Sequence, residues 1–174
     1  MNQVNELDFV HLHVHSEFSL VDGIIRVKEL VNNSADRGFH SVALTDLTNL
    51  FGLLEFYRTA RERGIKPIVG SEINIAKDKD SIAAPLVLIA INKQGYINLT
   101  KLVSKAYVEG QVKGEPIVFF KWLEEFSDGL IALSGVLEGH IGNSLLAGNV
   151  ELSESRADFF KKIFGDNFFL EIQR

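Results

Sequence analysis

The sequence contains no cysteine, which excludes a disulfide framework, a cysteine nucleophile and a zinc–thiolate site. Any metal ion must therefore be held by histidine and carboxylate side chains. Only 3 prolines occur among 174 residues, and 46% of the residues are hydrophobic, so the chain is neither disordered nor fibrous. This length and composition predict one folded domain, or part of one.

Positive charge is also in deficit, with 18 Lys and Arg against 23 Asp and Glu and a net charge of −5. This balance removes the long-range attraction that most free-standing nucleic-acid-binding proteins use. The first eight residues are polar and acidic, and the apolar run around residues 85–91 is shorter than a membrane span. Because neither segment has the character of an export signal or a membrane span, we expect a cytoplasmic protein.

Short apolar runs alternate with helical patterns along the chain. Residues 9–15 alternate strictly, which predicts a strand that carries His11, His13 and His15 on one face. Amphipathic helices are expected between the apolar runs, and glycines end the first two of these helices. Five further strands are predicted, at residues 41–46, 65–72, 86–91, 130–134 and 168–173.

A glycine that ends a helix, an apolar strand and an acidic residue occur twice along the chain with the same spacing. The first copy covers residues 36–46 and the second covers residues 62–72. Repeated helix–strand units with continuous apolar strands predict a parallel sheet covered on both faces. Since chemistry gathers at the carboxyl ends of parallel strands, His15, Asp46 and Glu72 are placed together at such ends.

The histidine triplet is the strongest local signal. Two imidazoles separated by one residue on a strand point the same way and can reach one metal ion or two adjacent ones. The alternative is a row of core histidines that are hydrogen-bonded to neighbouring polar groups. His11 lies deepest in this interpretation and is the one assigned a structural role.

The other polar candidates each have a structural alternative. Asp22 precedes a glycine in a turn, and turn chemistry alone accounts for it. Asp46 is interpreted as a helix cap or a loop hydrogen bond rather than a catalytic group, and Glu72 as a metal ligand or a capping residue. His40 and His140 are assigned to the surface.

Many short motifs follow one another in a single order over almost the whole chain. Together they resemble the PHP (polymerase and histidinol phosphatase) domain at the amino terminus of the alpha subunit of bacterial DNA polymerase III. The motifs that carry the resemblance include Phe9-Val-His-Leu-His-Val-His-Ser16, Ser19-Leu-Val-Asp-Gly23, Ala43-Leu-Thr-Asp46, Asn49-Leu-Phe-Gly52, Gly64-Ile-Lys-Pro-Ile-Val-Gly70, Ser104-Lys-Ala-Tyr107 and Phe169-Leu-Glu-Ile-Gln173.

The resemblance implies an α/β fold, a PHP-type distorted seven-stranded (β/α) barrel. Residues 1–174 would be the PHP domain without its C-terminal end, an N-terminal fragment with about six strands, and the polymerase domains would lie downstream. The implied metal ligands are His13, His15, Asp22 and Glu72.

Three positions depart from the family's ligand pattern. The family has histidines at the positions of Leu47 and Pro85, and a cysteine at the position of Val136. The resemblance therefore implies no catalytic residue and at most one weakly bound divalent metal, zinc, manganese or magnesium. Such a domain would be a scaffold that supports the polymerase, with DNA contacted through the parent protein. The alternative is an active metal-dependent phosphoesterase, such as a nuclease, a pyrophosphatase or a histidinol-phosphatase-like enzyme.

The implied partners are the proofreading exonuclease subunit and other subunits of the polymerase III holoenzyme. The densest aromatic segment outside the predicted strands is residues 117–126, which contains Trp122. If this segment is exposed, Trp122 or a neighbour is expected to contribute to exonuclease binding. Core packing is the alternative.

Overall fold

The computed structural model describes residues 9–20 and 22–172. The chain divides into two compact units, Met1–Val69 and Gly70–Arg174, and strand β2 (Lys66–Ala76) crosses the boundary between them. The described residues form six α-helices and seven strands, which confirms the α/β class. None of the helices in these ranges is long and apolar enough to cross a membrane. Residues 1–8 of the predicted domain and Gln173 of the last predicted strand lie outside the described residues.

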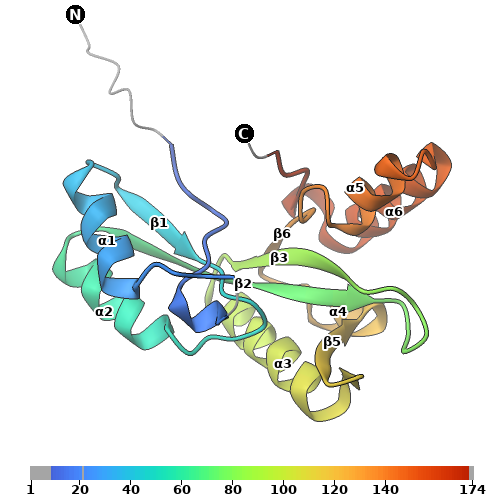
Figure 1. Cartoon of the computed structure of the whole chain (residues 1–174), viewed down its shortest axis with the longest axis horizontal. Helices are drawn as coiled ribbons and strands as arrows, with labels where there is room; N and C mark the ends of the chain where they lie inside the picture. Colours follow the sequence, from blue (N-terminus) through green and yellow to red (C-terminus); the bar gives the residue numbers. More distant parts are fainter. Residues whose placement is uncertain (1–8, 21, 173–174) are drawn as a thin grey trace, which may run out of the picture. The chain divides into compact units, whose positions relative to one another are not determined.

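The first unit packs two helices against a parallel pair of strands (Figure 1). Helix α1 (Val27–Asp36) precedes β1 (Ser41–Leu44), and α2 (Leu53–Glu62) precedes β2. The register of β1 and β2 runs from Ser41 opposite Lys66 to Leu44 opposite Val69. The core of this unit contains Val27, Leu30, Val31, Val42, Leu44, Phe56, Ala60 and Ile65.

Helices α1 and α2 end in the same way, as the sequence repeat predicts. Gly38 has a φ of 79°, and the next residue, Phe39, donates its N–H to the Ser34 carbonyl at 3.0 Å. Gly64 has a φ of 72°, and Ile65 donates to the Ala60 carbonyl at 2.9 Å. Each glycine supplies the left-handed residue of a helix C-cap, which turns the chain directly into the following strand.

Residues 9–15 do not form the predicted strand. Two backbone hydrogen bonds link this stretch to the β1 segment, from Ala43 N–H to the His11 carbonyl and from Thr45 N–H to the Val14 carbonyl, both 2.9 Å. The two bonds are three residues apart in this stretch, from His11 to Val14, but only two residues apart in the partner segment, from Ala43 to Thr45. This mismatch is typical of a β-bulge. The extra residue breaks the ladder and the strict alternation of side chains.

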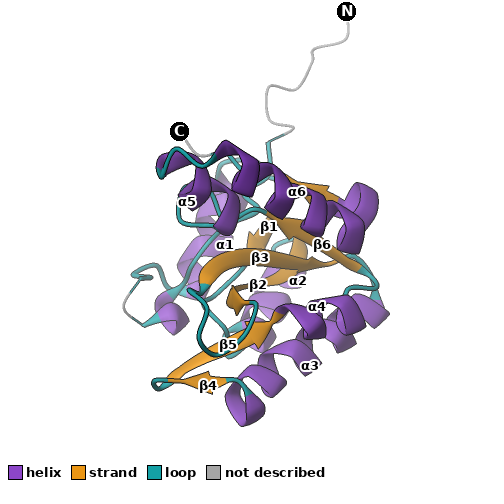
Figure 2. Cartoon of the chain, turned by 90° about the vertical axis from the view of Figure 1, so that its right-hand side faces the viewer, coloured by secondary structure: helices purple, strands orange, loops and turns teal. Residues whose placement is uncertain are grey.

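The second unit places helices on both sides of its strands (Figure 2). Helices α3 (Lys93–Glu109) and α4 (Phe120–Phe126) lie on one side. Helices α5 (His140–Leu146) and α6 (Val150–Phe164) lie on the other. The strands of this unit, besides the second part of β2, are β3 (Ala84–Ala90), β4 (Gln111–Val112), β5 (Glu115–Phe119), β6 (Leu130–Leu133) and β7 (Phe168–Phe169).

The prediction of a purely parallel sheet is wrong for this unit. Strand β3 runs antiparallel to both β2 and β6, whereas β5 pairs parallel with β2 and β7 parallel with β6. The apolar run in β3 reflects burial on both faces, since five of its seven residues are buried between the helix layers. Burial of this kind is independent of strand direction, so the apolar run does not report whether neighbours are parallel.

Two strand boundaries also differ from the prediction. Strand β2 continues to Ala76, so Glu72 lies inside it, opposite Val87 of β3, and not at a strand end. The last strand is limited to Phe168–Phe169. The short β4–β5 hairpin was not predicted; its two-residue turn has Lys113 and Gly114 at φ of 53° and 89°.

Trp122 belongs to the core, so the condition for a role in partner binding is not met. Its side chain is buried, its ring lies 4.8 Å from that of Phe119, and the Lys105 ammonium stands 4.8 Å from its centroid. Trp122 therefore packs α4 onto β5 and α3, whereas Phe120 of the same segment packs against Phe159 and Phe160 of α6.

Candidate metal site

His13 and His15 are neighbours in the first unit. Their ring centroids are 5.2 Å apart with an interplanar angle of 70°, and both residues are half-buried. The segment that carries them lies beside the end of β1, where the backbone bond from Thr45 to Val14 fixes the residue between the two histidines. The pair therefore offers two imidazoles from one short stretch of chain.

His11 does not share the site and does not lie deepest. It is exposed, and its ring packs edge-on against Phe9 and Phe39, with centroid separations of 4.9 and 5.3 Å. The bulge between residues 11 and 14 separates this side chain from the other two. Its contacts are nevertheless structural in kind, because they join the start of the segment to the loop before β1.

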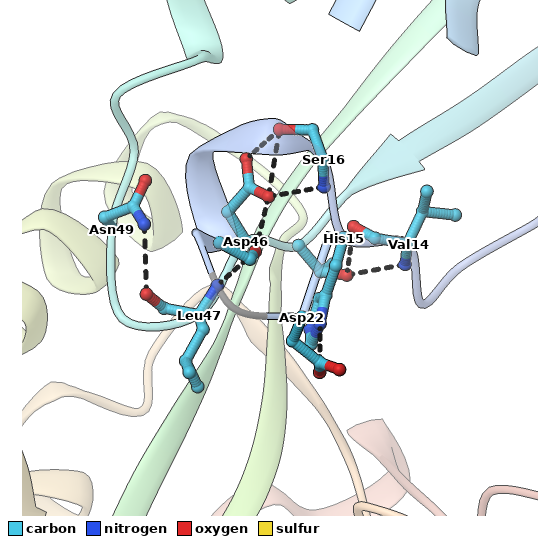
Figure 3. Close-up of polar contacts among 9 residues, drawn as sticks. Val14, His15, Ser16, Asp22, Asp46, Leu47 and Asn49 are labelled. Atoms are coloured by element: carbon cyan, nitrogen blue, oxygen red, sulfur yellow. Dashed lines mark hydrogen bonds and ion pairs between the residues drawn. The ribbon is translucent and has the colours of Figure 1, made fainter. Parts of the chain in front are cut away.

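Asp22 contacts His15 directly. Its Oδ2 atom lies 3.0 Å from His15 Nδ1, with the His15 side chain 12% exposed and that of Asp22 73% exposed (Figure 3). A carboxylate can only accept here, so the bond requires the proton on Nδ1. That tautomer leaves the lone pair on Nε2, the atom that a metal-binding histidine offers when its other nitrogen is held by a carboxylate.

Asp46 is a buried carboxylate that holds the chain after His15. It accepts hydrogen bonds from the Ser16 amide at 2.6 Å, from Ser16 Oγ at 2.8 and 3.0 Å, and from Ser19 Oγ at 2.7 Å. Ser19 Oγ in turn accepts from the Leu47 amide at 3.1 Å. The loop-bond interpretation of Asp46 is therefore confirmed, and the structure places no helix cap on it.

Thr45 holds the chain before His15. Its Oγ1 accepts from the Val14 amide at 2.8 Å and donates to the Val14 carbonyl at 3.1 Å, and the threonine is fully buried. Asn49 adds two bonds from Nδ2, to the Phe18 and Leu47 carbonyls at 2.9 and 3.0 Å. Residues 45–49 and 14–19 are thus joined through polar side chains.

Glu72 belongs to the second unit, half-buried on β2. Its carboxylate is a candidate metal donor, as are the imidazoles of His13 and His15. Two imidazole nitrogens and one carboxylate oxygen are donors that zinc and manganese accept, so the chemistry of the donor set fits a divalent metal.

The three positions that lack the expected ligands carry half-buried apolar side chains. Leu47 follows Asp46, Pro85 lies in β3 opposite Asn74, and Val136 follows β6. Val136 has a φ of 52°, an uncommon backbone conformation for a β-branched residue. None of the three side chains can coordinate a metal ion.

His140 is not at the surface as predicted. It is 6% exposed, and its Nε2 lies 2.9 Å from the Ile75 carbonyl, with the rings of Phe120 and Phe160 beside it. Burial lowers the pKa of this imidazole; the bond to the Ile75 carbonyl opposes that shift, and the charge of Arg156 adds to it. The spacing of His140, Ile141 and Ser144 on one face of α5 is the signal that could have indicated burial.

A sequence model of the PHP domain matches residues 11–174. The chain is 44% identical over 168 residues to DNA polymerase III subunit alpha of Vibrio cholerae, and 43% identical over 173 residues to that of Escherichia coli K12. The matches cover 95% and 98% of this chain, but the chain spans only 14–15% of the length of these relatives.

Among solved structures, the chain is similar to an amidohydrolase from Chromobacterium violaceum. The identity is 26%, and the similarity covers 56% of this chain and 32% of the other, with a TM-score of 0.45.

Proposed function

The chain belongs to the PHP domain family, and from this premise we propose that it acts as the PHP domain of a bacterial replicative DNA polymerase, the alpha subunit of polymerase III. The observation that carries the proposal is the identity of 43–44% to such subunits over 95–98% of the chain. DNA-directed DNA synthesis would then belong to the parent protein. That parent would work in the cytoplasm as part of the replication machinery.

Within that protein we assign the domain a scaffolding role rather than hydrolysis. A phosphoesterase of the multi-metal kind needs ions close enough to stabilise both the attacking and the leaving oxygen. Leu47, Pro85 and Val136 supply no donor atom for a second ion. The domain would support the polymerase body and bind the proofreading exonuclease and other holoenzyme subunits.

A single divalent ion is compatible with the remaining donors. His13, His15 and Glu72 would hold it, and Asp22 would take part either as a further ligand or as the acceptor that orients His15. The bond from His15 Nδ1 to Asp22 supports the orienting role, because it places the lone pair of the imidazole on Nε2, the nitrogen that would face a metal. An ion held there would crosslink the chain and polarise a bound water or phosphate oxygen.

The test is a hydrolysis assay on the purified chain with manganese or zinc. Substrates are a chromogenic phosphodiester, a single-stranded oligonucleotide and pyrophosphate. We expect no turnover above that of the metal alone, because the side chains of Leu47, Pro85 and Val136 offer no donor for a second ion. Metal-dependent turnover that His13→Ala abolishes, and that the exposed-histidine control His40→Ala retains, would instead establish an active phosphoesterase.

A further inference from the structure

The segment that carries His13 and His15 is not a regular strand, and side chains of neighbouring residues help to hold it. In residues 9–15 the carbonyls of His11 and Val14 accept backbone hydrogen bonds from Ala43 and Thr45, and Val14 is held in addition by the Thr45 hydroxyl. Such a segment has more conformational freedom than a paired strand, and a metal site needs its ligands held in place before the ion arrives. The groups that restrict this freedom therefore decide how well the two imidazoles are placed.

Two consecutive residues after β1 hold the two peptide neighbours of His15. Thr45 makes three hydrogen bonds to Val14, two through Oγ1 and one through its own amide. Asp46 holds Ser16 through the amide and the hydroxyl of that serine. Figure 3 shows His15 flanked by these two sets of contacts.

Asp46 is a charged side chain in a buried position. A carboxylate that is 1% exposed is costly to desolvate, and here two serine hydroxyls and one amide offset that cost. Ser19 donates to the same carboxylate and accepts from the Leu47 amide. The loop after β1 and the turn after His15 are therefore linked by hydrogen bonds through one carboxylate. The arrangement fixes the backbone on the C-terminal side of His15 from several directions.

We infer that Thr45 and Asp46 are positioning residues for metal binding, a clamp on Val14 and Ser16 that sets the orientation of the His15 imidazole. This inference rests on the metal binding proposed above. Neither residue coordinates the ion. Their effect is to present His15 to Asp22 and to the metal in one orientation, so that little conformational entropy is lost on binding.

The experiment compares the whole chain with clamp variants, using Zn²⁺ as the probe in competition with a chromophoric chelator. Thr45→Val removes the hydroxyl at nearly constant volume, and Thr45→Ser keeps it. Asp46→Asn removes the charge and one acceptor. We expect Thr45→Val and Asp46→Asn to weaken zinc binding by about 10- to 100-fold, the usual effect of losing an outer partner of a metal ligand, and Thr45→Ser to bind within about threefold of the wild type.

A second readout is the tautomer of His15 in the metal-free protein, obtained from imidazole ¹⁵N chemical shifts. We expect the Nδ1-protonated form to dominate in the wild type and in Thr45→Ser, and a mixture of tautomers in Thr45→Val. Val42→Ala is the matched control, because it destabilises β1 through the core without touching the clamp. It should lower the unfolding midpoint while leaving the tautomer and the zinc affinity unchanged.

The outcomes separate the inference from the proposal beneath it. If the wild type binds no zinc, the proposed metal binding is wrong and the inference falls with it. If the wild type binds zinc and the clamp variants bind equally well, or lose affinity only in proportion to stability as Val42→Ala does, the inference alone is wrong. Should Asp46→Asn fail to fold, Ser19→Ala tests the same carboxylate by removing one of its donors, with an expected loss of about threefold or more in zinc affinity.

Discussion

The side chain with the clearest pH-dependent effect on stability is His140. Its ring is enclosed by Phe120 and Phe160 and donates from Nε2 to the Ile75 carbonyl. Arg156 lies close by, since its Nη1 donates to the His140 carbonyl at 2.6 Å and to Ser144 Oγ at 2.5 Å. Burial, together with the positive charge of Arg156, opposes protonation and lowers the pKa of the imidazole.

This lowered pKa predicts that the protein loses stability below about pH 6.5, the ordinary value for histidine. Above that pH His140 is neutral in both states. As the pH falls, the unfolded chain takes up a proton that the folded state resists, so the free energy of unfolding falls by at most about 1.4 kcal/mol per pH unit until the folded state is protonated as well.

The measurement is denaturant unfolding at a series of pH values between 5 and 7.5. His140→Gln should flatten the curve in this window, whereas His40→Gln, at an exposed histidine, should leave it unchanged. Equal slopes for the wild type and His140→Gln would show that the buried imidazole is not the origin of the effect.

At the scale of elements, the first unit depends on the two matching helix ends. Gly38 and Gly64 occupy left-handed conformations that lead α1 into β1 and α2 into β2. A Cβ added at Gly64 would meet no atom within 4 Å, so a substitution there tests backbone conformation without a steric clash. The contribution of the helix end to stability can thus be measured separately from that of core packing.

We expect Gly64→Ala to lower the free energy of unfolding by about 1 kcal/mol, because an L-residue is disfavoured at this φ. Gly64→Asn should lose less, since asparagine tolerates the left-handed region better than alanine. Chemical denaturation of the three proteins gives the comparison. An alanine variant as stable as the wild type would mean that the helix end adopts another conformation in solution.

At the scale of the whole molecule, charge decides which partners are favoured. The net charge is −5, and no lysine or arginine occurs between residues 122 and 155. Six exposed carboxylates lie in that stretch, on Glu124, Glu125, Asp128, Glu138, Glu151 and Glu154. These carboxylates would repel duplex DNA, because affinity for DNA comes largely from cations that displace its counterions.

The proposed scaffolding role predicts that the protein binds the proofreading exonuclease subunit, and its acidic charge predicts that it does not bind duplex DNA at physiological salt. Fluorescence anisotropy with labelled exonuclease and with a labelled duplex measures both interactions. Glu124→Lys with Glu125→Lys should raise the weak DNA signal if repulsion is its cause. Tight DNA binding together with no detectable exonuclease binding would contradict the assignment.

What is local in the fold could be predicted from the sequence. Helices α1, α2, α3 and α6 follow from apolar spacing, and the two helix ends follow from glycines at the end of each pattern. The paired histidines and the acidic residues near them are also visible as a motif. These features depend on residues within one or two helical turns of each other, so the sequence records them directly.

The tertiary structure decided the features that depend on distant partners. The direction of β3 cannot be read from its apolar residues, because burial on both faces is equally favourable for parallel and antiparallel neighbours. The burial of His140 and Trp122 depends on strands and helices supplied from elsewhere in the second unit.

The role of Asp46 shows the same division within the candidate site. Its type and position after a strand were evident, but its hydrogen-bond donors, Ser16 and Ser19, lie 30 and 27 residues earlier in the chain. The sequence by itself determined that imidazoles and carboxylates would be available near the end of β1. Only the folded chain decided which carboxylate would orient His15 and which would fix the backbone beside it, because hydrogen bonding is directional and depends on how segments that are distant in sequence meet.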